Sequence, residues 1–224
     1  MTGLVRKATL LAVCGLLSAG AAMAHVPDPV NSDCPSSCIL IVGHDGTQGD
    51  PVGQYCVTVR DFNNVPIENS SVVLDFSNCD IQLCIDQHDP DVLVDCISQT
   101  VRKLTNVNGV ACFRVVGKRR TGAGCVIKPA NCAEVFADGV FLCNAFSPTF
   151  DLINENNTGV SGLDFSEFLH LFFDCGVYIS AIDYNCNGVV DGNDFSQFLG
   201  VFFGGASSQN CNPVKDPNVG PKCP

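Results

Sequence analysis

Two segments near the carboxyl end of the chain carry apolar residues at helical spacing. In "LDFSEFLHLFF" (residues 163–173), apolar side chains recur at i, i+3, i+4, i+7 and i+8, counted from Phe165 to Phe173. The segment "NDFSQFLGVFF" (residues 193–203) repeats this pattern 30 residues later, with seven of eleven positions identical. The pattern predicts two short amphipathic helices whose apolar stripes pack against each other. Neither helix exceeds about three turns, so each depends on the other for stability.

The first half of the chain shows a different period. Segments such as "QYCVTVR" (residues 54–60) and "SSVVLDF" (residues 70–76) have the composition and alternation of short strands. Asn-Gly at 108–109 and Asp-Gly at 138–139 predict hairpin turns, because these residue types tolerate positive φ. At least six short strands without a long helix favour an antiparallel β-sandwich.

The first 24 residues have the layout of an export signal. Arg6 and Lys7 precede an apolar stretch at 8–17 that is too short to span a bilayer, and small residues end the segment at Ala24. We therefore predict a signal peptide at residues 1–24 and a secreted or cell-surface protein. No membrane span is expected after cleavage, because no long apolar segment follows.

Cysteine usage agrees with an oxidising compartment. Of 15 cysteines, 14 remain once Cys14 of the predicted signal is set aside. An even number in an exported chain indicates disulfide bonds. The chain contains no C-x-x-C pair, which is the spacing that would indicate a zinc cluster held by thiolates. The pairing cannot be deduced from spacing. Cys211 and Cys223 are expected to join the tail to itself, to Cys175 or to Cys186.

The charge balance restricts the kind of partner. Without Arg6 and Lys7, 10 of the 12 basic residues remain against 23 acidic residues, which gives a net charge of −13. Such a chain favours cations and disfavours nucleic acid and anionic membranes. The one basic cluster, "GKRRTG" (residues 117–122), is flanked by glycines, and we expect it to be a solvated loop.

An oxygen-rich loop precedes the second predicted helix. Residues 183–194, "DYNCNGVVDGND", fit the calcium-loop pattern D-x-[DN]-x-[DN]-G, with an acidic residue at the twelfth place. Calcium takes six to eight hard oxygen ligands, and a tight loop can turn alternate side chains towards one ion. The predicted ligands are Asp183, Asn185, Asn187, the carbonyl of Val189, Asp191 directly or through water, and Asp194.

The loop before the first helix is a weaker match. One register, counted back from Asp164, puts Ile153 at the first ligand place, where oxygen is needed. The other begins at Asn154 and uses Asn156 and Thr158, in a loop one residue shorter. Both registers carry less charge than the second loop. We therefore expect one Ca²⁺ in the second loop and leave a second, weaker ion open.

This duplicated loop and helix resembles the type I dockerin, an EF-hand-like family; the likeness covers about 55 of the 224 residues. The twelfth place is Asp instead of Glu and no helix precedes the loop, which separates the segment from ordinary EF-hands. The resemblance implies calcium binding and docking onto a cohesin module in an extracellular, polysaccharide-degrading assembly. It also implies eight partner-contacting positions, which are Gly162, Leu163, Leu169, His170, Gly192, Asn193, Leu199 and Gly200.

The strand region carries a second resemblance. "VTVRDFNNVPIENSSVVLDF" and "TNVNGVACFRV" are similar to bacterial immunoglobulin-like modules of the invasin type. Asn64 stands where that family usually has glycine, and Cys112 where it commonly has threonine. The resemblance implies an immunoglobulin-like fold and says little about function.

Together these patterns predict four regions. They are a signal peptide (1–24), an all-β immunoglobulin-like sandwich (25–147), a small α-helical dockerin-like pair (148–205) and a Cys- and Pro-rich tail (206–224). No G-x-S-x-G, H-E-x-x-H or phosphate-binding glycine loop is present, so we expect a non-catalytic protein. Two alternatives to docking stay open. One is a structural surface protein whose calcium-stabilised repeats pack on its own β domain. The other is a carbohydrate-binding accessory module, although the chain has no Trp and three Tyr.

Overall fold

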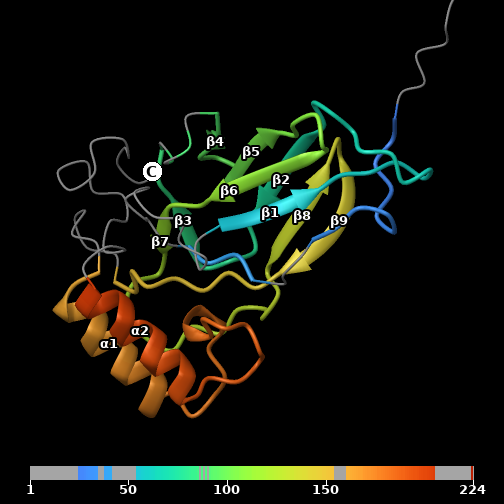
Figure 1. The fold of residues 1–224 in the computed structure, drawn as a ribbon. Helices are drawn as coiled ribbons and strands as arrows, with labels where there is room; N and C mark the ends of the chain where they lie inside the picture. Colours follow the sequence, from blue (N-terminus) through green and yellow to red (C-terminus); the bar gives the residue numbers. More distant parts are fainter. Residues whose placement is uncertain are drawn as a thin grey trace, which may run out of the picture.

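The computed structural model describes residues 25–34, 38–41, 54–85, 87, 89, 91–153, 160–204 and 223. The predicted signal peptide, nearly all of the tail and the first-loop residues Asn154, Asn156 and Thr158 lie outside this part of the chain. The described residues form an antiparallel β-sheet region followed by two helices, as the sequence patterns predict (Figure 1). Within them, no helix is long and apolar enough to cross a membrane.

Among the described residues, nine short strands build the β region. Five form one sheet in the order β4-β5-β2-β8-β9, while β1 pairs with β6 and β3 pairs with β7, and every pairing is antiparallel. The strands are β1 (Gln54–Thr58), β2 (Ser71–Asp75), β3 (Ile81–Leu83), β4 (Leu93–Asp95), β5 (Thr100–Leu104), β6 (Val110–Arg114), β7 (Gly117–Arg119), β8 (Ala133–Ala137) and β9 (Val140–Ala145).

Alternate residues of these strands point into one core. Val57 of β1 and Phe113 of β6 are fully buried, as are Leu74 of β2 and Val135 of β8. All four belong to a single apolar cluster, and β1 and β6 lie over the five-stranded sheet (Figure 1). The period of two read from the sequence therefore places the apolar face of each sheet inward.

One predicted hairpin is confirmed and the other is not. Asp138 and Gly139 both take positive φ, +47° and +81°, in the turn that joins the paired strands β8 and β9. The turn at 106–109 exists, but β5 and β6 on its two sides belong to different sheets. Gly109 is needed there, because a Cβ at this position would lie 2.5 Å from the Val59 carbonyl oxygen.

The basic cluster is not a solvated loop, contrary to the prediction. Lys118 and Arg119 lie in β7 and are 1% and 0% exposed. The Arg119 guanidinium can be buried because carboxylates surround it, as described below. Sequence composition alone does not reveal those partners.

In the part of the chain that the structure describes, two antiparallel helices follow the β region. They are α1 (Gly162–Phe173) and α2 (Gly192–Gly204), with a 3₁₀ turn at Ser180–Ile182 between them. Ring contacts join Phe165 to Phe202 at 5.2 Å and Phe168 to Phe198 at 4.5 Å between centroids, so the start of α1 faces the end of α2. The stripe-to-stripe packing is therefore confirmed for these rings.

The last residue of each predicted stripe is an exception. Phe173 and Phe203 are 70% and 75% exposed and do not join the helical core. At 100° per residue, position i+8 lies about 80° from the first residue of the stripe, at its edge. Leu171 is buried instead, in the apolar cluster that also contains Ile179 and Ile182 of the segment between the helices.

Six disulfide bonds join described cysteines, as expected for a disulfide-rich chain. Three connect different regions of the chain: Cys38–Cys186 and Cys125–Cys175 join the β region to the helical region, and Cys96–Cys223 joins it to the tail. Cys84 is also disulfide-bonded. The expected partners for Cys175, Cys186 and Cys223 are therefore corrected, because each bonds to a cysteine far away in the sequence. The full set is Cys34–Cys143, Cys38–Cys186, Cys56–Cys112, Cys79–Cys132, Cys96–Cys223 and Cys125–Cys175.

Candidate functional site

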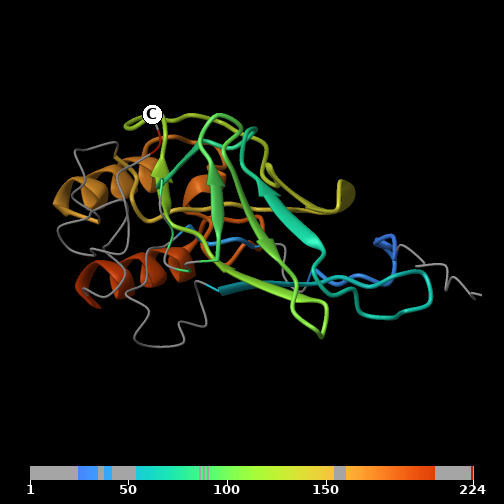
Figure 2. The same cartoon turned by 90° about the horizontal axis from the view of Figure 1, so that it is seen from above.

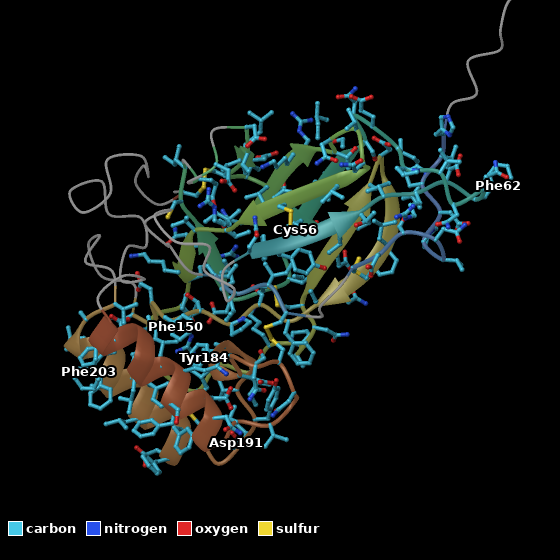
Figure 3. The ribbon with its side chains drawn as sticks, in the orientation of Figure 1. Cys56, Phe62, Phe150, Tyr184, Asp191 and Phe203 are labelled. Atoms are coloured by element: carbon cyan, nitrogen blue, oxygen red, sulfur yellow. A yellow bond between two sulfur atoms is a disulfide. The ribbon has the colours of Figure 1, made fainter. Side chains whose placement is uncertain are left out.

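The helices sit at one end of the β region, and the oxygen-rich loop lies beside them. Figure 2 shows the two helices together at this end, and Figure 3 places Phe203 and Asp191 there, with Phe62 at the opposite end. Tyr184 anchors the start of the loop. Its ring stacks on Phe150 at 4.0 Å between centroids, and its hydroxyl donates to the Thr149 carbonyl at 3.2 Å.

A buried ion-pair network also holds α1 against the β region. Arg119 Nε donates to Asp80 Oδ2 at 3.0 Å, and its Nη1 donates to Glu167 Oε1 at 3.1 Å. Its Nη2 donates to the Gly124 carbonyl, and the Gly124 N–H donates to Glu167 Oε1 at 2.6 Å. The arginine is fully buried and both carboxylates are nearly so. The position of α1, and through it of α2, is therefore fixed by the β region.

Asp194 closes the loop from its carboxyl end. Its Oδ1 accepts the N–H of Tyr184 at 2.8 Å and that of Asn185 at 3.3 Å, and its Oδ2 accepts the N–H of Asp191 at 2.9 Å. One fully buried carboxylate thus joins the start of the loop to the first turn of α2. Every one of these donors is a backbone N–H, so the Asp194 side chain helps to fix the conformation of the loop backbone.

Asp183 organises the other side of the loop. Its Oδ1 accepts the N–H of Asn187 at 3.2 Å, and its Oδ2 accepts the N–H of Gly188 at 2.9 Å. The Tyr178 hydroxyl donates to the same Oδ2 at 2.6 Å. Burial raises the pKa of Tyr178, and this hydrogen bond raises it further, so the phenol stays protonated and donates. Gly188 takes φ +83°, which a sharp turn at the sixth place requires.

The middle of the loop is a series of amide turns. Asn185 Oδ1 accepts the Asn187 N–H at 3.0 Å, and Asn187 Oδ1 accepts the Val189 N–H at 2.8 Å. Cys186 lies between the two amides and bonds to Cys38, so a covalent link braces the loop from outside. Each amide oxygen accepts a single hydrogen bond here and keeps a second lone pair for another partner.

Asp191 caps the second helix and is less buried than the other two carboxylates of the loop. Its Oδ1 accepts the Asn193 N–H at 2.7 Å, which makes it the amino-terminal cap of α2. The carboxylate oxygens of Asp183, Asp191 and Asp194 do not all lie within 4.8 Å of one another. Asp191 is half-buried, whereas Asp183 and Asp194 are fully buried, so Asp191 lies nearer to solvent, as a ninth ligand that acts through water would.

The electrostatics of the loop fit a divalent cation. Asp183 and Asp194 are both 0% exposed. Burial raises the pKa of Asp194, and the neighbouring charge of Asp183 raises it further, against the effect of the backbone donors. Two buried carboxylates that repel each other, together with amide and carbonyl oxygens, form the hard-oxygen donor set that calcium prefers.

The first loop has its own buried pair of carboxylates. Asp164 Oδ1 accepts the N–H groups of Leu152 and Ile153 at 2.7 and 2.9 Å, and its Oδ2 accepts the Ser161 N–H at 2.7 Å. Asp194 accepts from Tyr184, Asn185 and Asp191 in the same way. This equivalence places Asp151, which is 3% exposed, where Asp183 stands, instead of Ile153 or Asn154. The first loop is then two residues longer than the second.

The eight positions implied for partner contact lie on the helical pair, and most are accessible. Leu163 is 56% exposed, and the His170 side chain is 44% exposed. Gly162, Gly192, Asn193 and Gly200 are also exposed, whereas Leu169 and Leu199 are half-buried. The structure adds Phe173 and Phe203 to this surface. Sequence reasoning assigned both to the core, although their place at the stripe edge could have indicated exposure.

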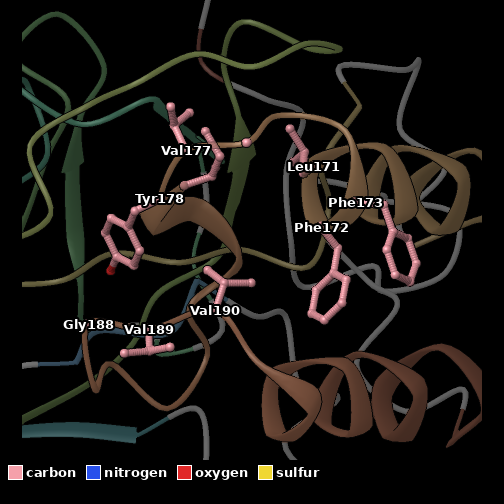
Figure 4. Close-up of a pocket in the computed structure, with 10 residues that line it drawn as sticks. Leu171, Phe172, Phe173, Val177, Tyr178, Gly188, Val189 and Val190 are labelled. Atoms are coloured by element: carbon pink, nitrogen blue, oxygen red, sulfur yellow. The ribbon is translucent and has the colours of Figure 1, made fainter.

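A groove lies between the end of α1 and the loop. Its volume is about 340 Å³, and the residues around it are mainly apolar (Figure 4). Phe173, Val177 and Val189 are 70%, 48% and 56% exposed at its rim, and Tyr178 contributes the side chain that donates to Asp183. The groove and the loop therefore share residues, so the loop conformation sets the groove shape.

Compared with known proteins, the chain matches no family model, no curated protein and no solved structure.

Proposed function

We propose that this chain is an exported, non-catalytic protein that binds calcium in loop 183–194 and docks onto a protein partner through its helical pair. The buried carboxylate pair Asp183 and Asp194, inside a loop of oxygen donors, carries this proposal. The many disulfides support an oxidising, extracellular location. The paired antiparallel sheets suit an immunoglobulin-like module that braces a dockerin-like pair.

The ion would be held by the second loop. The ligands are the side chains of Asp183, Asn185, Asn187, Asp191 and Asp194 and the carbonyl of Val189. Bound Ca²⁺ supplies the positive charge that two buried carboxylates otherwise lack. The residues of the chain do the rest: Asp194 ties the loop to α2, and Tyr178 holds Asp183. In the first loop, Asp151 and Asp164 are the anchors we propose for a second, weaker ion.

The docking surface combines exposed apolar rings with negative charge. Phe173 and Phe203 stand at opposite ends of the antiparallel pair, and residues 160–204 contain six acidic residues and neither Lys nor Arg. Phenylalanine is among the residues enriched at protein–protein interfaces. A cohesin-type partner would therefore meet the helices with apolar side chains surrounded by basic ones.

A purely structural role is the second candidate function, and the covalent and ionic links between the helical pair and the β region support it. The helical pair is tied to the β region by Cys38–Cys186, Cys125–Cys175 and the buried Arg119 ion pairs. Such ties favour a structural protein in which the repeats only pack on their own β domain. The two functions differ in one respect, because docking requires a partner whose binding depends on calcium.

Calcium binding is tested on the full secreted chain by calorimetry and thermal unfolding, in EDTA and in millimolar calcium. At 100 times the dissociation constant, calcium adds about 2.7 kcal/mol to the free energy of unfolding. For a chain of this size that corresponds to a rise of about 5–10 °C in Tm. D194N is expected to lose most of this rise, whereas D33N, at an exposed aspartate of the β region, keeps it. Identical melting with and without calcium would refute calcium binding.

Docking is tested by pull-down with purified cohesin modules, with and without chelator. F173A and F203A are expected to weaken binding at least about 30-fold if the rings are interaction hot spots. F62A is the matched control, since Phe62 is 71% exposed at the opposite end of the molecule (Figure 3). Binding that ignores chelator, or that falls equally in F62A, contradicts the proposal. Calcium binding without any cohesin binding favours the structural function.

A further inference from the structure

A second group of metal-ligating side chains lies away from the calcium loop. Cys125 follows β7, His170 lies in the last turn of α1, and Cys175 comes just after that helix. Cys125 and Cys175 are joined as a disulfide, and Cys125 Sγ lies 3.7 Å from His170 Nε2. The three ligand atoms all lie within 4.8 Å of one another. Among the described residues this is the one such group of three.

This disulfide is the most accessible of those described. Cys125 is exposed, whereas every other described cysteine is buried or half-buried. Thiol–disulfide exchange requires a thiolate to reach a sulfur atom, so access controls which bond opens first. A mild dithiol in solution will therefore reach Cys125–Cys175 before it reaches the disulfides inside the β region.

The imidazole is oriented for a ligand. His170 Nδ1 lies 3.2 Å from Asp174 Oδ2, and a carboxylate only accepts, so the proton is on Nδ1. Nε2 then keeps its lone pair on the side of Cys125. Carboxylates that hold the far nitrogen of a histidine in this way are characteristic of metal sites, because they fix the tautomer and the ring orientation.

The spacing suits zinc. With Zn–S near 2.3 Å and Zn–N near 2.05 Å, tetrahedral angles put a sulfur and a nitrogen ligand about 3.6 Å apart. The present separation of 3.7 Å already agrees with that value. The two sulfur atoms must move apart, from bonding distance to about 3.8 Å. Sulfur and imidazole are softer ligands than the oxygens of loop 183–194, so this site selects a different ion.

We propose that Cys125–Cys175 is reducible in the folded protein and that its reduced form binds Zn²⁺ together with His170. A dithiol supplies two electrons and two protons, which break the S–S bond and leave two thiols, while the dithiol becomes a cyclic disulfide. Zinc then displaces the two thiol protons to solvent. Two thiolates and Nε2 fill three positions, and water takes the fourth.

The test uses the full secreted chain in calcium, reduced briefly with dithiothreitol, desalted without oxygen and titrated with Co²⁺ as a spectroscopic probe for zinc. Mass mapping after alkylation is expected to find Cys125 and Cys175 opened first. Sulfur-to-cobalt charge-transfer bands appear, Co²⁺ slows alkylation of both thiols at least about 10-fold, and Zn²⁺ displaces the cobalt. H170A is reduced equally well but binds Co²⁺ at least about 10-fold more weakly. S166A, an exposed change on the same helix, behaves as wild type.

Three results would overturn the proposal. The first is that another disulfide opens before Cys125–Cys175. The second is that both thiols are alkylated at the same rate with and without Co²⁺. The third is that H170A binds cobalt as tightly as wild type, which would show that the imidazole is not a ligand. None of these readouts depends on calcium binding or docking.

Discussion

Replacing Arg119 with methionine tests how firmly the helical pair is held by the β region. The side chain is fully buried and makes its ion pairs with Asp80 at 3.0 Å and Glu167 at 3.1 Å. R119M keeps much of the buried volume but leaves both carboxylates without their cation. Removing one partner of a buried ion pair costs about 3–5 kcal/mol. We expect the lower end, because Thr121 still donates to Asp80 and Gly124 to Glu167.

A loss of about 3 kcal/mol is a large share of the 5–15 kcal/mol typical of a folded domain. It lowers Tm by about 6–12 °C in a chain of this size. The assay is guanidinium unfolding followed by circular dichroism, with calcium fixed and the disulfides intact. R102M is the matched control, since Arg102 is exposed on β5, and it should change the free energy of unfolding by less than about 0.5 kcal/mol.

A second substitution sharpens the test. E167Q alone is expected to destabilise the protein, because it weakens the bond from Arg119. In the R119M background the same change removes an unpaired buried charge, while the oxygen of the introduced amide can still accept from Gly124. The double variant should therefore be more stable than R119M. A loss below about 1 kcal/mol for R119M, or further destabilisation by E167Q in that background, would refute the reasoning.

Three further predictions concern the helical core, the Cys38–Cys186 disulfide and the loss of stability at acid pH. F198A removes the ring at the centre of the helical core and should cost about 3–5 kcal/mol in chemical unfolding. Replacing Cys38 and Cys186 with serine should cost about 2–4 kcal/mol and weaken calcium binding measured by calorimetry, because the loop loses its external tie. The N–H of Val65 and the His25 ring lower the pKa of Asp61 below its ordinary 3.8, so its contribution to stability is present above pH 3.8 and is lost as pH falls through the lowered pKa. D61N keeps an oxygen for the turn and should flatten that loss in an acid titration of unfolding.

Local patterns predicted the elements but not their long-range partners. The phenylalanine repeat identified both helices and the packing of their apolar stripes, which the contact of Phe168 with Phe198 confirms. It could do so because helical periodicity is encoded within a dozen residues. Asn-Gly at 108–109 correctly marked a turn. It could not reveal that β5 pairs with β2 and β6 with β1, since pairing depends on the whole sheet. Disulfide connectivity was beyond reach for the same reason.

In the candidate site, too, the sequence predicted the local features but not the contacts between distant residues. The loop pattern named Asp183 and Asp194, and both are buried at the positions that the pattern gives them. It did not indicate that Tyr178 would hold Asp183, because that contact depends on how the chain enters the loop. The basic cluster at 117–122 was misleading, since burial of Arg119 is decided by Asp80 and Glu167, which are distant in sequence.

The cross-links Cys38–Cys186 and Cys125–Cys175 connect the inter-helix segment to the β region at two points. If a partner pulls on the helices, the load passes through covalent bonds into the sheets instead of peeling the helices away. A covalent tether of this kind withstands pulling forces at which non-covalent packing alone would separate. Single-molecule extension should accordingly show short, stiff ruptures until a reductant is added.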